Sequence, residues 1–229
     1  MGTLQVALLN ASYNDSMTTE NFRRDVDADV RPFAVNKGHR PETFEYDAVI
    51  VSGSGASVYW DEPWIEPLAD WVGGAIERDV PVLGVCFGHQ LVAHALGGDV
   101  SPMGEYELGY REVEVEDSSV LFDGLPDRFV AFTTHSDEVT ALPPDATVIA
   151  ANECSIQGFR RGHAFGVQFH PEYDRASAER VTRNKDLPDE RIRGVLDGIT
   201  DETVDAATDA KTVFDNFLGY ARRRTETDR

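Results

Sequence analysis

The chain of 229 residues has only two cysteines and three lysines, and it lacks any long hydrophobic run. Cys86 and Cys154 are too few to build the disulfide framework of a small secreted domain. A helix needs about 18 consecutive apolar residues to cross a bilayer, and no such run is present, so the sequence predicts no membrane span. The first ten residues also lack the basic and apolar segments of a signal peptide. These absences predict a cytoplasmic protein.

Basic residues are scarce relative to acidic ones. The chain has 21 Lys and Arg against 41 Asp and Glu, for a formal net charge of −20. A surface of this sign repels phosphate backbones, which argues against nucleic-acid binding. The acidic residues are spread along the whole chain, and the lysines are only Lys37, Lys185 and Lys211. We interpret this composition as adaptation to a high-salt cytoplasm, where mobile ions screen the self-repulsion, with an ordinary acidic enzyme as the alternative.

The first half of the chain alternates short apolar runs with helical patterns. Hydrophobic residues make up 41% of the chain, which excludes wholesale disorder. Buried strands are predicted over residues 4–10, 47–53 and 80–86, with an amphipathic helix over 62–79 and a short helix over 89–98. Strand, helix and strand in this order predict right-handed crossovers and a parallel sheet.

The second half contains closely spaced strand candidates separated by turn residues. They are residues 110–117, 128–135, 146–152, 155–162 and 163–170. Their spacing predicts antiparallel additions to the parallel sheet. The sequence therefore predicts a three-layer α/β fold, in which helices flank a mostly parallel central sheet that carries an antiparallel addition.

Helical patterns return from Arg175 onward. Residues 204–221 predict an amphipathic last helix that packs on the sheet, whereas 182–201 have few large apolar residues and are interpreted as a peripheral helical insert. We found no repeat and no low-complexity linker. The interpretation is one domain over 1–229 with a helical C-terminal extension over about 176–229.

A cysteine stands where a strand is expected to end and a helix to begin, in the segment GVCFGHQ (84–90). This is the layout of a nucleophile elbow with Cys in place of Ser. The flanking glycines allow close backbone approach, and the helix N-terminus stabilises a thiolate and offers N–H groups to an oxyanion. Cys86 is therefore a candidate nucleophile, with a buried structural cysteine as the alternative.

A base and a carboxylate follow another strand candidate, in the segment QFHPE (168–172). Pro171 keeps His170 out of the helical region, and in an extended segment residues i and i+2 face the same way. His170 and Glu172 can therefore lie side by side, with the carboxylate fixing the tautomer of the imidazole. The alternative is a surface His and a surface Glu after a strand.

Four segments together resemble the class I glutamine amidotransferases, a family with a Cys–His–Glu triad. They are GVCFGHQ (84–90), VQFHPE (167–172), the loop SGSGAS (52–57) where relatives carry a Gly-Gly-Pro-type loop, and THSDEV (134–139). The last is similar to the guanylate-synthetase-like branch of the family. The resemblance covers about residues 4–175 and implies a flavodoxin-like fold.

The resemblance implies a role for each matching residue. Cys86 would be the nucleophile, His170 the general base and then acid, and Glu172 the orienting carboxylate. Backbone groups of one loop and of the elbow would form the oxyanion hole, and these are Ser54, Phe87 and Gly53. The substrate glutamine would be held by the elbow helix and the fourth segment, at Gln90, Gly88, Thr134, His135, Ser136 and Asp137. The loop departs from the family at Ser54-Gly55, where a more flexible backbone would need a ligand or partner to set it.

The implied reaction is hydrolysis of the side-chain amide of glutamine to glutamate and ammonia through a cysteinyl thioester. It needs no metal and no organic cofactor. No synthetase segment is visible in this sequence, so the implied partner is a separate synthetase that accepts the ammonia. Two alternatives stay open: a γ-glutamyl or peptide hydrolase on the same fold, and a non-catalytic regulatory subunit.

Other candidate sites are weaker. His89 and His94 are five residues apart and do not share a helix face, so no metal-ligand set is expected around them. Cys154 lies in a hairpin-like turn with no base nearby in sequence, and we interpret it as structural. The SGSG loop lacks the Lys-Ser/Thr of a phosphate-binding loop.

Overall fold

The computed structural model describes residues 2–118 and 120–227, and within them nine strands form one sheet in the order β2-β1-β3-β4-β9-β8-β7-β5-β6. The strands of the first half are β1 (Gln5–Asn10), β2 (Asp29–Ala34), β3 (Ala48–Val51) and β4 (Val82–Val85). Each pairs in parallel with its neighbour in the sheet. The predicted parallel sheet is therefore confirmed, with β3 and β4 buried along their whole length as fully covered parallel strands are.

Two elements of the first half were not predicted. Helix α1 (Asp15–Asp25) is polar, with Phe22 its one fully buried large side chain, and β2 carries Pro32. Because β2 pairs only with β1 and lies at the edge of the sheet, it tolerates a proline and needs no continuous apolar run. Neither element therefore has the apolar periodicity on which the prediction depended.

The second half adds the antiparallel part of the sheet. Its strands are β5 (Asp99–Val115), β6 (Arg128–Ala141), β7 (Thr147–Ala151), β8 (Ile156–Arg161) and β9 (Ala164–Val167). The pairs β5–β6, β5–β7, β7–β8 and β8–β9 are antiparallel, as expected. The prediction for 163–170 as a further antiparallel addition is wrong in one respect, because β9 also pairs in parallel with β4. β9 thus joins the two halves of the sheet.

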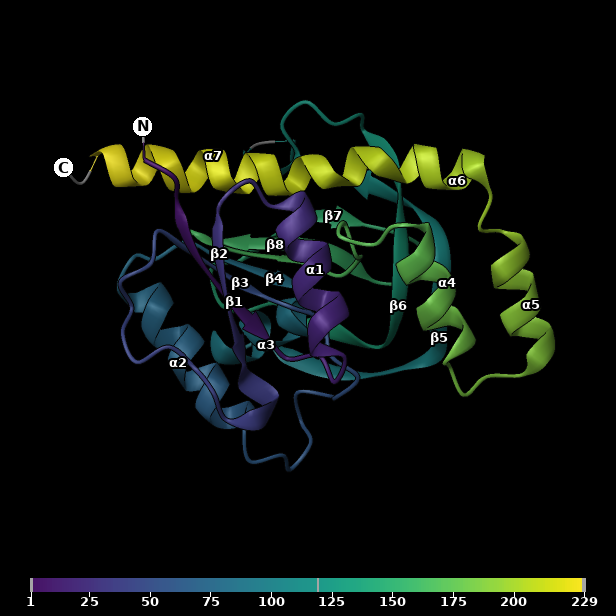
Figure 1. Ribbon diagram of the computed structural model, residues 1–229, viewed down its shortest axis with the longest axis horizontal. Helices are drawn as coiled ribbons and strands as arrows, with labels where there is room; N and C mark the ends of the chain where they lie inside the picture. Colours follow the sequence, from purple (N-terminus) through teal and green to yellow (C-terminus); the bar gives the residue numbers. More distant parts are fainter. Residues whose placement is uncertain (1, 119, 228–229) are drawn as a thin grey trace.

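Helices cover both faces of the sheet (Figure 1). Helices α2 (Ile65–Glu77) and α3 (Phe87–Ala95) share one hydrophobic core with one face of β1, β3 and β4. Helix α1 and the long α7 (Thr212–Thr227) share a second core with the other face, where Phe214 meets Phe22 at 5.7 Å between ring centroids. The three-layer α/β prediction is confirmed.

Between β9 and α7 the chain forms a run of short helices. They are α4 (Arg175–Arg183), α5 (Asp189–Asp197), α6 (Asp201–Ala206) and the 3-10 turn η3 (Ala207–Lys211), and two further 3-10 turns are η1 (Val35–Lys37) and η2 (Val120–Phe122). The single helix predicted over 204–221 is therefore divided among α6, η3 and α7. Within 182–201, α5 buries no residue fully, but Leu187, Val195 and Leu196 pack against a third core over β5 and β6. Among the described residues, no helix is both long and apolar enough to cross a membrane.

Candidate active site

Cys86 lies at a tight turn between β4 and α3. Its backbone has φ 54° and ψ −106°, a conformation that costs a non-glycine residue energy and is found mainly at functional sites. A Cβ on Gly84 would lie 2.2 Å from the carbonyl oxygen of Gly88, and a Cβ on Gly88 would lie 2.2 Å from that of Val51. Both positions therefore require glycine, Gly84 because β4 lies close to the first turn of α3, and Gly88 because that turn lies close to β3. The elbow expected from the sequence is present.

Helix α3 begins at Phe87, directly after the cysteine. The first N–H groups of a helix have no intrahelical acceptor, so the backbone N–H of Phe87 stands available beside the thiol. The thiol itself donates a long hydrogen bond, 3.8 Å, to the carbonyl oxygen of Thr134 on β6. The helix N-terminus therefore faces the place where negative charge would develop on a carbonyl attacked by Cys86.

His170 and Glu172 lie beside the elbow because β9 pairs in parallel with β4. Val85 is in register with Val167, and the N–H of Cys86 donates to the carbonyl oxygen of Val167 at 2.8 Å. The chain beyond Val167 therefore emerges at the same edge of the sheet as the cysteine. A Cβ on Gly53 would lie 2.8 Å from Cε1 of His170 and 3.6 Å from Cβ of Cys86, so the three residues are neighbours.

The imidazole and the carboxylate form a buried pair. Nδ1 of His170 donates to Oε1 of Glu172 at 2.8 Å, and the two residues are only 4% and 2% exposed. An ionised carboxylate can only accept, so the proton lies on Nδ1 and Nε2 faces the cavity. Tyr173 stacks on the imidazole ring at 4.2 Å between centroids. The ring is thus fixed in both orientation and tautomer.

The charge of this pair favours a protonated imidazole. Burial alone would lower the pKa of His170, but the nearby Glu172 carboxylate and Cys86 outweigh it and raise that pKa to about 10. A ring with so high a pKa would hold a proton next to the sulfur of Cys86 at neutral pH. The arrangement therefore places a proton donor beside Cys86.

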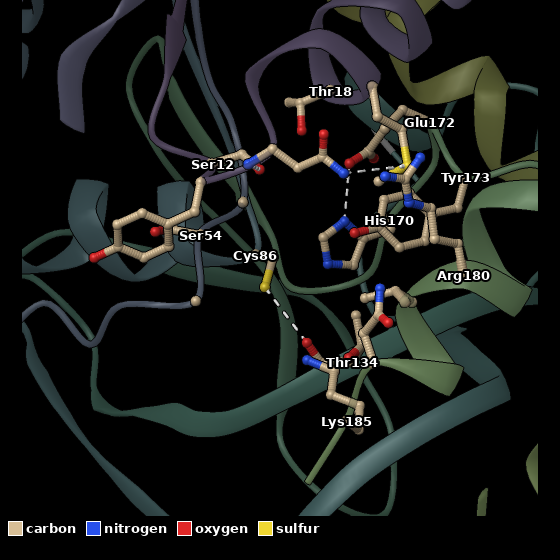
Figure 2. A pocket seen from close by; sticks show the side chains of 17 residues that line it. Ser12, Thr18, Ser54, Cys86, Thr134, His170, Glu172, Tyr173, Arg180 and Lys185 are labelled. Carbon is tan, nitrogen blue, oxygen red and sulfur yellow. Dashed lines mark hydrogen bonds and ion pairs between the residues drawn. The ribbon is translucent and has the colours of Figure 1, made fainter. Parts of the chain in front are cut away.

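Two cavities meet at the cysteine, and Figure 2 shows the side chains that line the larger one. The larger, of about 360 Å³, contains Gly53, His170 and Glu172 in its lining. The smaller, of about 260 Å³, is lined by the elbow and by the fourth predicted segment, with Phe87, Gln90, Thr134, His135, Ser136 and Asp137 among its residues. Ser54 and Cys86 line both. The smaller cavity therefore gathers most of the residues expected to hold the substrate, while Gly88 instead fills the contact with β3.

Asp137 and Gln90 bind other protein groups as well as lining the smaller cavity. The carboxylate of Asp137 accepts hydrogen bonds from Ser57 Oγ at 2.5 Å and from the hydroxyl of Tyr59 at 2.8 Å. The side-chain amide of Gln90 donates to the backbone oxygen of Asp137 at 2.9 Å and to Oε1 of Gln168 at 3.1 Å. These contacts connect the loop after β3, the elbow helix, β6 and the segment before His170.

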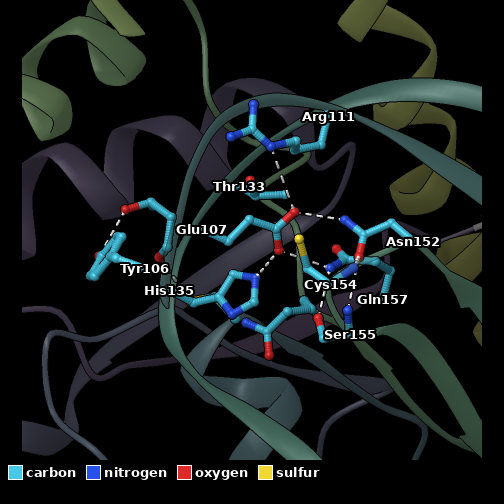
Figure 3. A network of polar contacts seen from close by, with 12 residues as sticks. Tyr106, Glu107, Arg111, Thr133, His135, Asn152, Cys154, Ser155 and Gln157 are labelled. Atoms are coloured by element: carbon cyan, nitrogen blue, oxygen red, sulfur yellow. Dashed lines mark hydrogen bonds and ion pairs between the residues drawn. The ribbon is translucent and has the colours of Figure 1, made fainter. Parts of the chain in front are cut away.

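A buried polar network lies behind this junction (Figure 3). His135 directs Nδ1 at the backbone oxygen of Asp137, 2.9 Å away, and Nε2 at Oε2 of Glu107, 2.5 Å away. Burial raises the pKa of Glu107, but hydrogen bonds from His135 and Asn152 outweigh it and keep that pKa below its ordinary value. Both ring nitrogens of His135 thus lie within hydrogen-bond distance of oxygen atoms. Glu107 was not predicted from the sequence, because it reaches His135 only through the pairing of β5 with β6.

The remaining sequence candidates lie away from this site or serve packing. Cys154 is exposed in the turn between β7 and β8, so its interpretation as a structural cysteine is not supported. His94 pairs with Glu66 at 3.0 Å. His89 is fully buried against Phe159, and burial lowers its pKa to about 3. Within residues 2–118 and 120–227, no group of three His, Cys, Asp or Glu side chains is placed to hold a metal ion.

Known proteins match this chain in sequence and in fold. The family model for class I glutamine amidotransferases matches residues 9–185. The GMP synthase (glutamine-hydrolysing) of Thermomicrobium roseum is 43% identical over 125 residues, which cover 54% of this chain and 23% of that protein. A GMP synthase (glutamine-hydrolysing) subunit of Methanopyrus kandleri is 43% identical over 98 residues, covering 41% of this chain and 52% of that one. A glutamine amidotransferase structure from Thermotoga maritima matches 95% of this chain and 99% of its own, with a TM-score of 0.79 at 24% identity.

These matches differ in what they cover. The chain spans about a quarter of the length of the Thermomicrobium roseum protein and about half of the Methanopyrus kandleri subunit. The structural match supports the α/β fold, and the family match over 9–185 contains the elbow, the loop after β3 and the His170–Glu172 segment. The resemblance inferred from the four segments is confirmed, and the chain belongs to the class I glutamine amidotransferase family.

Proposed function

We propose that this chain hydrolyses the side-chain amide of glutamine and supplies the ammonia to a separate synthetase. The observation that carries the proposal is the position of Cys86 on a strained elbow, next to a His170–Glu172 pair 2.8 Å apart and above a cavity of about 260 Å³. Nucleophile, base and orienting carboxylate in this arrangement support acyl transfer through a covalent intermediate.

In the first step the thiolate of Cys86 attacks the amide carbonyl of glutamine. The C–S bond forms as the carbonyl oxygen becomes an oxyanion, which the backbone N–H groups of Phe87 and Ser54 would stabilise. The oxyanion then collapses and the C–N bond breaks, while His170 gives its proton to the leaving nitrogen. The products are ammonia and a γ-glutamyl thioester.

In the second step water hydrolyses the thioester. Neutral His170 takes a proton from the water as its oxygen attacks, and Cys86 leaves as a thiolate. Glutamate departs, and the imidazolium–thiolate pair is restored with Glu172 holding the ring. His170 carries the protons of both bond-breaking steps, and the γ-carboxylic acid that forms loses its own proton to solvent.

The acceptor of the ammonia is proposed from the relatives. They include the glutamine-hydrolysing GMP synthases of Thermomicrobium roseum and Methanopyrus kandleri. We therefore propose a synthetase of that kind as the partner, and a cytoplasmic location for both chains. The deciding measurement is release of glutamate and ammonia from glutamine by the purified chain, alone and after addition of a GMP synthase that lacks its own glutaminase. Turnover of γ-glutamyl peptides in preference to glutamine would support a hydrolase instead, and absence of turnover under both conditions would support a regulatory role.

The loop that carries Ser54 is expected to depend on Asp137 for its position. Ser57→Ala removes one of the two hydroxyl groups that bind the Asp137 carboxylate. A loosened loop presents its oxyanion donor less accurately, so we expect kcat to fall about tenfold, less than the roughly 10²–10³ of losing a donor outright. Steady-state glutaminase assays measure this. Ser57→Thr should recover most of the loss and a change at the exposed Ser118, Ser118→Ala, should have no effect, whereas a wild-type kcat in Ser57→Ala would contradict the role of the contact.

The acidity of the chain predicts stabilisation by salt. With a net charge of −20, the folded state contains many like charges. The Debye length is about 30 Å at 0.01 M salt and about 3 Å at 1 M, so dilute buffer leaves this repulsion unscreened. We expect both Tm and glutaminase activity to rise between dilute buffer and molar KCl. A flat or falling Tm across the series would show that the acidity is not a salt adaptation.

A further inference from the structure

Lys185 lines both cavities at the cysteine. It follows α4, in the segment interpreted from the sequence as a peripheral insert. Among the described residues that line the smaller cavity, it is the one lysine or arginine. The insert therefore contributes a positive charge to the cavity proposed for glutamine.

The Asp137 carboxylate and the His135 imidazole of the smaller cavity already have partners. Asp137 accepts from Ser57 and Tyr59, and His135 binds Glu107 and a backbone oxygen. Lys185, in contrast, forms no ion pair within the described parts of the chain, and its ammonium instead contacts the ring of Tyr106. Its charge is thus available to a ligand.

The position of Lys185 is set by Tyr106. The ammonium lies 4.9 Å from the centroid of the Tyr106 ring, within the range of a cation–π interaction. The hydroxyl of Tyr106 is 3.0 Å from Oγ1 of Thr134, and its backbone oxygen accepts from Arg191 of α5. Tyr106 therefore connects the helical insert to β6, where the carbonyl oxygen of Thr134 accepts the hydrogen bond from the thiol of Cys86. Figure 2 shows Lys185 and Thr134 on the same side of the cavity.

A glutamine bound in the smaller cavity carries a negative charge on its α-carboxylate. Its α-carboxylate lies at the opposite end from the reacting amide, so a substrate bound with the amide at Cys86 directs that carboxylate toward the rim. Free glutamine carries an α-ammonium as well as the α-carboxylate, so the net charge of −20 does not repel it as a whole, and its carboxylate needs a local cation as partner. We propose that Lys185 binds the α-carboxylate of glutamine and makes the site specific for the free amino acid. This inference rests on the proposed function and identifies a specificity residue within it.

The test compares two substrates in the full chain. L-glutamine carries the α-carboxylate, whereas L-glutaminamide replaces it with an uncharged amide. For Lys185→Gln we expect KM for glutamine to rise about tenfold with kcat nearly unchanged, since the contact is made equally before and during the reaction. KM for glutaminamide, whose only charge is the α-ammonium, should not rise. An unchanged KM for glutamine, or an equal rise for both substrates, would overturn the proposal.

Two further variants separate contact from net charge. Arg183→Gln removes a positive charge from the preceding helix, where Arg183 pairs with Glu179 at 2.8 Å and does not line the cavities, and it should leave KM unchanged. Lys185→Arg should recover most of the affinity for glutamine. If Arg183→Gln raised KM as much as Lys185→Gln, the effect would be one of overall charge and the contact would be refuted.

A binding measurement keeps this inference distinct from the proposed function. If the wild-type chain does not hydrolyse glutamine, the proposed reaction fails, yet calorimetry with Cys86→Ala still measures binding of each ligand. Tighter binding of glutamine than of glutaminamide, lost in Cys86→Ala/Lys185→Gln, would support the contact. Equal binding of the two ligands by Cys86→Ala would refute it.

Discussion

Cys86→Ala is expected to abolish glutamine hydrolysis, with kcat falling about 10⁶-fold, below detection in an ordinary assay. The reaction requires a covalent bond to sulfur, and no other side chain at the elbow can supply a nucleophile. Alanine retains the Cβ and so occupies the same backbone conformation at φ 54° with little additional strain. The loss would therefore come from the chemistry and not from unfolding, which an unchanged Tm verifies.

Covalent labelling tests the same residue independently of turnover. A diazo-ketone analogue of glutamine should attach to the wild-type chain, one molecule per chain as measured by mass spectrometry, and should not attach to Cys86→Ala. Cys154→Ala is the matched control, since Cys154 is exposed and lines neither cavity at Cys86, and it should keep both labelling and activity. Residual glutaminase activity in Cys86→Ala above roughly one part in a thousand would refute the mechanism.

His170→Asn is expected to reduce kcat about 10⁴-fold, and Glu172→Gln about 10²-fold. The first change removes the group that carries the proton. The second keeps the shape of the side chain, but an amide stabilises the imidazolium less well than the carboxylate that now lies 2.8 Å from Nδ1. Steady-state rates at fixed pH rank the two variants, and equal rates for Glu172→Gln and wild type would refute the orienting role.

The pH profile provides a sharper test of Glu172. The Glu172 carboxylate helps to raise the pKa of His170 to about 10, so the imidazolium persists below that pH and is lost as the pH rises through it. Because the leaving ammonia needs this proton, activity should decline on the alkaline side near pH 10. In Glu172→Gln the pKa of His170 falls, and the alkaline limb should move to lower pH. A purely structural change at this position would lower the rate without moving the limb.

The elbow and the His170–Glu172 segment could be predicted from the sequence because their signals are local. The segment GVCFGHQ specifies strand, turn and helix within seven residues, and Pro171 sets the extended conformation beside His170. The pairing of β9 with β4 could not be predicted in the same way, because a four-residue apolar run is equally suited to parallel and antiparallel neighbours. The motifs therefore identify the side chains of the site, whereas the strand pairing that brings them together is seen only in the structure.

Residues that act through distant contacts left no local signal. Glu107 meets His135 across 28 positions of sequence, and Lys185 reaches the cavity only because α4 and α5 pack on β5 and β6. The segment around Lys185 has few large apolar residues, which led to its interpretation as peripheral. The position of Lys185 depends on packing partners such as Tyr106, which periodicity in a single sequence does not identify.

The register of β4 with β9 makes the chemistry depend on strand length more than on strand composition. Val85 and Val167 are paired, and the side chains of Cys86 and His170, to which we assign the reaction, lie one and three residues beyond that pair. Replacing one buried aliphatic residue of either strand by another changes packing and hence stability, but leaves Cys86 opposite His170. Side chains alternate between the two faces of a sheet with a period of two. Adding or deleting a single residue therefore moves every later side chain of the strand to the opposite face. The buried aliphatic residues of β4 and β9 should therefore tolerate aliphatic substitution, but the two strands should not tolerate the insertion or deletion of a residue.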